Sequence, residues 1–146
     1  MTPSSNEGHS AWLYMPSGKA GAAVLVIELG ASNLAIHLPP SLAAILEILN
    51  AARDADAFAG WPPEVRGWRT AEQIAKAVAD QSQWSYPVSP GSIRKYIGRI
   101  DRAIREAHER QRGDQAGDLD LRVVVRRRAL GYKLGMPVQI VRPKPR

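Results

Sequence analysis

The chain has 146 residues, of which 45% are hydrophobic and 23% charged, so it suits one ordinary folded domain and is unlike a disordered chain. It has no cysteine, which excludes disulfides, thiolate metal sites and a cysteine nucleophile. Its formal net charge of +6 predicts an anionic polymer or an anionic surface as the partner.

The remaining compositional signals concern metals and membranes. Three histidines, His9, His37 and His108, are scattered without the spacing of metal ligands, so we expect neither a metal site nor a cofactor. No apolar run is long enough to span a bilayer, and residues 1–20 lack a basic stretch followed by an apolar one. We therefore expect a cytoplasmic protein with no membrane partner.

Positive charge is concentrated toward the C-terminal end. No acidic residue follows Asp120, whereas basic residues recur to the end of the chain: Arg122, Arg126, Arg127, Arg128, Lys133, Arg142, Lys144 and Arg146. Several of them fall inside a predicted strand. This placement favours a functional surface over a tail that only aids solubility.

The N-terminal part reads as β-structure. Residues 1–10 are polar, and we expect them to be flexible. Residues 24–29 are rich in β-branched and aliphatic side chains, and residues 34–38 alternate apolar and other residues, with a turn at 30–33 between them. A weaker third strand is expected at 12–15.

Two helices are predicted next. The first begins at Pro39-Pro40-Ser41, and apolar residues follow it at helical spacing: Leu42, Ile45, Leu46 and Leu49. Residues 53–68 are rich in Gly, Pro and Trp and are expected to form a loop. Thr70 caps the second helix, because Gln73 stands three residues after it as in a capping box.

The third helix is predicted from Ser89 to about Arg110. Serine at the N-cap and proline at the first helical position favour this start. One apolar face carries isoleucines at helical spacing: Ile93, Ile97, Ile100 and Ile104. After a polar loop, residues 121–128 and 132–134 predict a hairpin. Residues 137–146 hold three prolines and three basic residues, and a basic flexible tail is expected there.

The predicted order is therefore two or three antiparallel strands, three helices and a β-hairpin, an α+β domain over residues 11–136. On the third helix, Lys95, Arg99 and Arg102 share a face that the isoleucines leave free, and Arg94 and Arg105 flank it. Gly91, Ser92 and Gly98 are small, so a DNA backbone can approach this surface closely. Such a helix suits the major groove of DNA, where lysine and arginine meet guanine or phosphate. The competing interpretation is a basic face that is merely solvated.

The hairpin is the second basic cluster, with Arg126, Arg127 and Arg128 beside its turn. Consecutive strand residues face opposite sides, but long side chains near a turn still converge on one anionic partner. An arginine at a hairpin tip suits a narrow minor groove. The alternative is that these charges only protect an edge strand from aggregation.

Three motifs carry a family resemblance. Residues 36–46 (IHLPPSLAAIL) resemble a strand that runs into a helix with paired apolar residues. Residues 92–100 (SIRKYIGRI) resemble a recognition helix, and residues 127–134 (RRALGYKL) resemble a wing signature. Over about residues 20–135 the chain thus resembles the winged helix-turn-helix effector domain of the bacterial OmpR/PhoB-type response regulators. The resemblance implies a sequence-specific transcription regulator that binds double-stranded DNA.

The resemblance also implies roles for single residues. Lys95 and Arg99 match base-contacting positions, Tyr96 a position near phosphate, and Arg128 the wing arginine of the minor groove. We include the neighbouring residues in the expected DNA-binding set: Ser92, Arg94, Arg102, Arg126, Arg127 and Lys133. Tyr132 matches a structural wing tyrosine.

Four departures from the family pattern stand out. Ala129 replaces a wing glycine, and Asp101 stands where a basic residue is common. The first helix lacks the glutamate usual near its start. No receiver domain precedes the fold, so we expect no phosphorelay within this chain.

The connection of residues 80–88 carries two large aromatics, Trp84 and Tyr86. They are candidates for a protein interface, with RNA polymerase as the partner that the resemblance implies or, alternatively, a separate signalling protein. The competing interpretation is that the rings cover the small core.

Two other functions compete with DNA binding. Winged helices also serve as adaptors that bind only protein, and a fold does not fix a function. An enzyme is disfavoured, because the carboxylates form no spaced acid–base pair and Ser, His and Asp form no nucleophile motif. The oligomeric state stays open, including a dimer on DNA.

Overall fold

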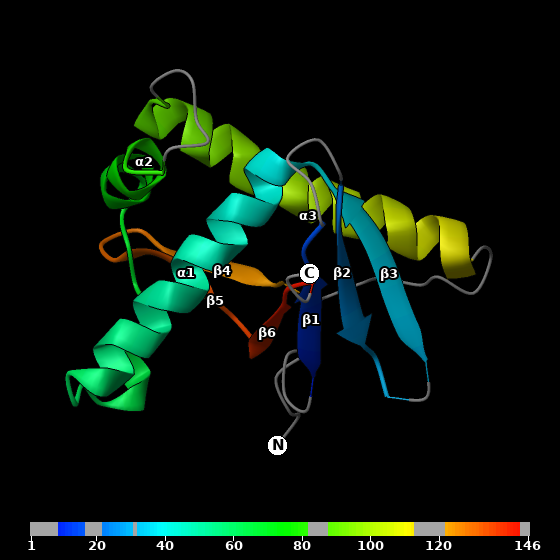
Figure 1. Ribbon diagram of the computed structural model, residues 1–146, viewed down its shortest axis with the longest axis horizontal. Coiled ribbons are helices and arrows are strands. Elements are labelled where there is room, and N and C mark those ends of the chain that lie inside the picture. The colour runs from blue at the N-terminus through cyan, green and yellow to red at the C-terminus, as the bar shows by residue number, and fades with distance from the viewer. Residues whose placement is uncertain (1–8, 17–21, 31, 82–87, 113–121, 144–146) are drawn as a thin grey trace.

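The computed structural model describes residues 9–16, 22–30, 32–81, 88–112 and 122–143 (Figure 1). This part of the chain has an α+β fold, as predicted. Its elements in chain order are β1 (Ser10–Tyr14), β2 (Ala23–Glu28), β3 (Asn33–Leu38), α1 (Pro40–Phe58), the 3-10 turn η1 (Pro63–Val65), α2 (Ala71–Ala79), α3 (Pro90–Arg112), β4 (Val124–Arg127), β5 (Gly131–Leu134) and β6 (Val138–Val141).

The first sheet has the strand order β3-β2-β1-β6. Its three N-terminal strands are antiparallel neighbours, with Leu13 opposite Leu25 and Leu25 opposite Ile36. These three side chains are buried, whereas their neighbours along each strand are more exposed, which is the period-two pattern of a sheet with one covered face. The expected antiparallel strands are thus confirmed.

The C-terminal segment differs from the prediction. Residues 138–141 form β6, parallel to β1, in place of part of the expected flexible tail. The open edge of β1 supplies backbone partners, since the Ala11 N–H donates to the Pro137 carbonyl at 2.9 Å and the Met15 N–H donates to the Val141 carbonyl at 2.8 Å. Val138 is buried. Local sequence is a poor guide here, because the partner strand lies at the other end of the chain.

Helix α1 is longer than predicted. The loop expected from residue 53 begins only after Phe58, because Ala55, Ala57 and their neighbours favour helix. Gly60 then takes a left-handed φ of 84° that ends the helix geometry. The extra turns place Asp56 where it meets the segment before α2.

Asp56 ties that segment to α1, and Arg69 ties it to the hairpin. Its buried carboxylate accepts hydrogen bonds from the Gly67 N–H at 2.7 Å and from both terminal nitrogens of Arg69 at 3.0 Å. The Arg69 hydrogen bonds, with the Gly67 N–H, lower the pKa of Asp56 against the effect of its burial. Arg69 also forms a two-way backbone bridge with Tyr132, both bonds 2.8 Å long. The segment before α2 therefore flanks β5.

The predicted helix starts are confirmed. The Gln73 N–H donates to the Thr70 hydroxyl at 3.1 Å, and the Gln73 side chain accepts from the Thr70 N–H at 2.8 Å. At the start of α3, the Ser92 N–H donates to Ser89 Oγ at 3.1 Å. Both caps satisfy helix N–H groups that would otherwise lack a partner.

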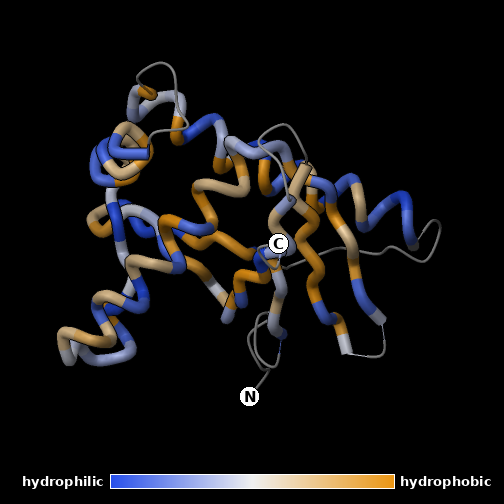
Figure 2. Tube along the Cα trace, viewed as in Figure 1, coloured by the Kyte–Doolittle hydropathy of each residue, from blue (hydrophilic) through white to orange (hydrophobic). Residues whose placement is uncertain are grey.

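The core lies where the sheet, the helices and the hairpin meet (Figure 2). The isoleucine face of α3 is buried, with Ile93 and Ile100 fully covered, and α3 passes behind β2 and β3 in Figure 1. Within the described residues, no helix is long and apolar enough to cross a membrane.

Candidate nucleic-acid interface

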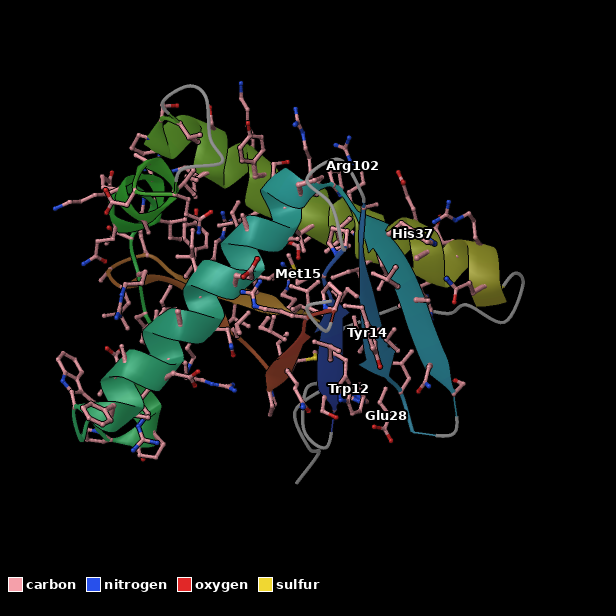
Figure 3. All side chains as sticks on the ribbon, viewed as in Figure 1. Trp12, Tyr14, Met15, Glu28, His37 and Arg102 are labelled. Carbon is pink, nitrogen blue, oxygen red and sulfur yellow. The ribbon has the colours of Figure 1, made fainter. Side chains whose placement is uncertain are left out.

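Helix α3 presents a basic face that consists of Lys95, Arg99 and Arg102. All three side chains are exposed, whereas the isoleucines on the opposite side are buried. Arg102 projects from α3 on the side away from the core (Figure 3). The predicted division of the helix into a buried and a charged face is therefore what the structure has.

Two members of the expected site lie at the border of this face. Tyr96 is half-buried and packs against the core, and the Arg99 guanidinium lies over its ring, 5.5 Å from the centroid. This cation–π contact restrains the Arg99 side chain. Ser92 is also half-buried, and its hydroxyl lies 3.1 Å from Ser89 Oγ. Its side chain is thus engaged in the helix start.

Asp101 does not interrupt the basic face. Its side chain is 22% exposed and pairs with Arg122 at 3.6 Å, at the base of the hairpin. Burial raises the pKa of Asp101, while the charges of Arg122, Arg105 and Arg126 oppose that shift. Asp101 thus joins α3 to the segment that leads into β4.

The hairpin strands β4 and β5 put their basic residues on two faces. Arg126 is opposite Tyr132, and Arg127 is opposite Gly131. Because side chains alternate along a strand, Arg126 shares a face with the buried Tyr132 and Arg127 lies on the other face. The turn is tight, with the Leu130 N–H donating to the Arg127 carbonyl at 3.0 Å.

Ala129, which stands where the resembled family usually has a glycine, causes no backbone strain. Among the described residues only glycines have positive φ, and in the hairpin that residue is Gly131, at 97°. Ala129 therefore adopts a backbone conformation that any residue accepts.

Helix α3 and the hairpin meet at an open hollow of about 490 Å³, called here the arginine hollow. Arg94 lines it from α3, and the start of α2 lines it from the side. The hairpin supplies three consecutive arginines, and the lining includes Thr70, Ala71, Glu72, Arg94, Arg126, Arg127, Arg128, Ala129, Gly131 and Tyr132. Folding thus brings one arginine of α3 and the three hairpin arginines, some thirty residues apart in sequence, to one place, whereas Lys95, Arg99 and Arg102 do not line this hollow.

Glu72 is the member of the hollow that sequence reasoning missed. Its carboxylate lies 3.7 Å from the Arg94 guanidinium, with both side chains largely exposed. An acidic residue in the first turn of a helix is favourable in any protein, because it faces the positive end of the helix dipole, so Glu72 gives no local signal of a site. Nothing in the local pattern placed that turn against the hairpin.

Other predicted residues lie elsewhere. Lys133 does not line the arginine hollow; its ammonium lies 4.9 Å from the centroid of the Trp68 ring, on the other face of the hairpin. Trp84 and Tyr86 lie outside the described residues. Within the described ranges, no three His, Asp or Glu side chains gather as a metal site would require.

No family model, no curated protein and no solved structure matches this chain.

Proposed function

We propose that this chain is a sequence-specific transcription regulator that binds double-stranded DNA with a winged helix-turn-helix. The element order and the two sheets are compatible with that layout, in which α3 is the recognition helix and β4–β5 the wing. Such a protein would act in the cytoplasm, with its DNA.

The arginine hollow carries the proposal. Arg94, which flanks the basic face of α3, and the arginines of the hairpin line one surface. The basic face of α3 and the hairpin, each taken alone, also suit a solvated protein surface. A duplex offers phosphates on both sides of its major groove, so one partner would satisfy both clusters at once.

The exposed basic side chains have different proposed roles in binding DNA. Lys95 and Arg99 would read base edges in the major groove, and the Tyr96 ring would hold Arg99 in place for that contact. Arg94 and Arg102 would meet phosphates, and Arg128 at the hairpin turn would enter the minor groove.

The first test is selection of bound duplexes from a random pool, followed by a salt titration on the enriched sequence. We expect an enriched motif, and a log affinity that falls with log salt with a slope of roughly 4–7, about 0.9 per phosphate contact. An unenriched pool together with a slope near zero would remove DNA as the partner.

Two variants that each remove one positive charge test whether the salt dependence of binding arises from the hairpin. Arg128→Ala should reduce the salt slope by about one contact, and Arg53→Ala, which removes a charge from α1 outside both clusters, should leave the slope unchanged. Equal effects of the two variants would mean that net charge, and not the hollow, attracts DNA.

A further inference from the structure

The C-terminal end of α1 and the segment after it expose large apolar side chains, which define the α1 tip. Phe58 is 96% exposed, Trp61 51% and Val65 43%. Among the described residues, only Tyr14 and Leu130 are comparable exposed hydrophobics, and they lie on other elements. Exposed apolar side chains that gather on one part of a surface are a feature of interaction sites.

The α1 tip is held in a defined conformation. The Trp61 N–H donates to the Asp56 carbonyl at 3.0 Å, and the Trp61 carbonyl accepts from Arg66 Nε. The Val65 N–H donates to the Pro62 carbonyl at 3.1 Å. Because the backbone around the exposed rings is already ordered, a partner that covers them would lose little conformational entropy.

Beside the α1 tip is a hollow of about 340 Å³ between α1, η1 and the connection from β5 to β6. Much of its wall is apolar, from Ala57, Pro63, Leu134, Met136 and Pro137, and the other lining residues are Arg53, Asp54, Arg66, Lys133 and Gly135. An apolar side chain of a partner would therefore find both a hollow and an adjacent exposed surface.

The cations of this hollow lack carboxylate partners in the described part of the chain. Arg53 and Arg66 donate to backbone carbonyls, and Lys133 lies over the Trp68 ring. None of the three takes part in an ion pair between described residues. Asp54 is the one acidic residue of the lining, so positive charge is in excess.

We propose that the α1 tip and this hollow dock a protein segment in which apolar side chains are flanked by carboxylates. Its apolar side chains would cover Phe58 and Trp61, and its carboxylates would meet Arg53, Arg66 and Lys133. The tip lies at the end of α1 that projects away from α3 (Figure 1). A duplex on α3 would leave it accessible, and the proposal does not depend on DNA binding.

The test is selection of random displayed peptides on the full chain, followed by affinity measurements with the enriched peptides carrying a fluorescent label. We expect an excess of Asp and Glu around Leu, Phe or Trp. The Phe58→Ser, Trp61→Ser double variant should bind these peptides at least about tenfold more weakly, as loss of aromatic anchors does. Arg53→Gln should weaken binding less and reduce its salt dependence.

The matched control is Tyr14→Ser, which removes an exposed aromatic ring from the sheet (Figure 3) and should leave peptide affinity unchanged. Melting temperatures of all variants would check that these surface changes preserve the fold. Enriched peptides without acidic excess, or equal binding to the double variant, would overturn the proposal.

Two further measurements test other occupants of this surface, and a third separates this proposal from the proposed function. Loss of duplex affinity in the double variant would assign the α1 tip to nucleic acid, and loss of a dimer in light scattering would assign it to a second copy; either outcome overturns the proposal. Peptide binding that persists when the wild type binds no duplex would support this surface while contradicting the proposed function.

Discussion

At the scale of single residues, Gly131 has the tightest steric constraint of the hairpin. Its φ is 97°, and a Cβ atom at this position would lie 2.2 Å from the Arg69 carbonyl oxygen. That oxygen accepts the Tyr132 N–H, so the clash falls on the backbone bridge that ties the hairpin to the segment before α2. The close approach of two backbones is possible only because this residue has no side chain.

We therefore expect Gly131→Ala to lower the free energy of unfolding by at least about 2 kcal/mol. The control is Gly98→Ala on the exposed side of α3, where an added Cβ would meet nothing within 4 Å. Alanine should stabilise that helix by up to about 1 kcal/mol. Chemical denaturation measures both; a neutral Gly131→Ala would contradict the observed packing.

Asp56 should make the stability of the fold depend on pH. Arg69 and the Gly67 N–H hold the pKa of Asp56 below its ordinary value of 3.8, so its stabilising contribution is fully present above that pH. The contribution is lost as the pH falls through the lowered pKa. Asp56→Asn should therefore be less stable than the wild type near neutral pH, and the difference should shrink in acid.

Denaturation of both proteins from pH 7 to pH 2 checks this. Subtracting the two curves removes the effect of Asp101, whose pKa is raised and whose stability contribution has the opposite sign. A difference that stays constant with pH would show that Asp56 does not titrate as its contacts imply.

At the scale of elements, helix α3 makes three kinds of contact along its length. Arg94 near its start lines the arginine hollow, its isoleucine face from Ile93 to Ile104 is buried, and its last turn covers the edge of the sheet. There the Gln111 side chain donates to the Ala35 carbonyl at 2.7 Å and accepts from the Ala35 N–H at 3.4 Å. These bonds occupy backbone groups on an edge strand that would otherwise invite pairing with another chain.

The proposed function predicts different effects for two arginines of α3. Arg99→Ala should cost about 1–3 kcal/mol on the selected duplex and relax discrimination at one base pair. Arg102→Ala should weaken all duplexes about equally, since phosphates carry no base information. A binding-site selection repeated with each variant distinguishes the two outcomes. An unchanged motif with Arg99→Ala would contradict the assigned reading face.

At the scale of the whole molecule, β6 closes the fold by joining its two ends. Val138 is 4% exposed, and the whole strand pairs with β1. Truncation after Met136 should lower the free energy of unfolding by at least about 2 kcal/mol, because it exposes buried valine and removes backbone partners from β1. Truncation after Pro143, which keeps β6, should have little effect on the melting temperature. Equal melting temperatures would contradict the role of β6.

Several features of this protein follow from local sequence. The isoleucine spacing determines the buried face of α3, and the Thr70 and Gln73 pair determines the start of α2, because a helix end needs partners for its free N–H groups. Alternation of apolar residues predicts β2 and β3 in the same way. These signals act within a few residues of one another, so the sequence alone reveals them, together with the excess of positive charge.

Only the tertiary structure decided where distant segments meet. Residues 53–58 contain good helix formers beside turn residues, and the contact of Asp56 with Arg69 accompanies the longer helix. Residues 138–141 are too short to predict a strand without β1 as a partner. The arginine hollow likewise combines Arg94 with residues 126–128, and the hollow beside the α1 tip combines α1 with the β5–β6 connection. Such contacts depend on packing between remote elements, and no local pattern encodes them.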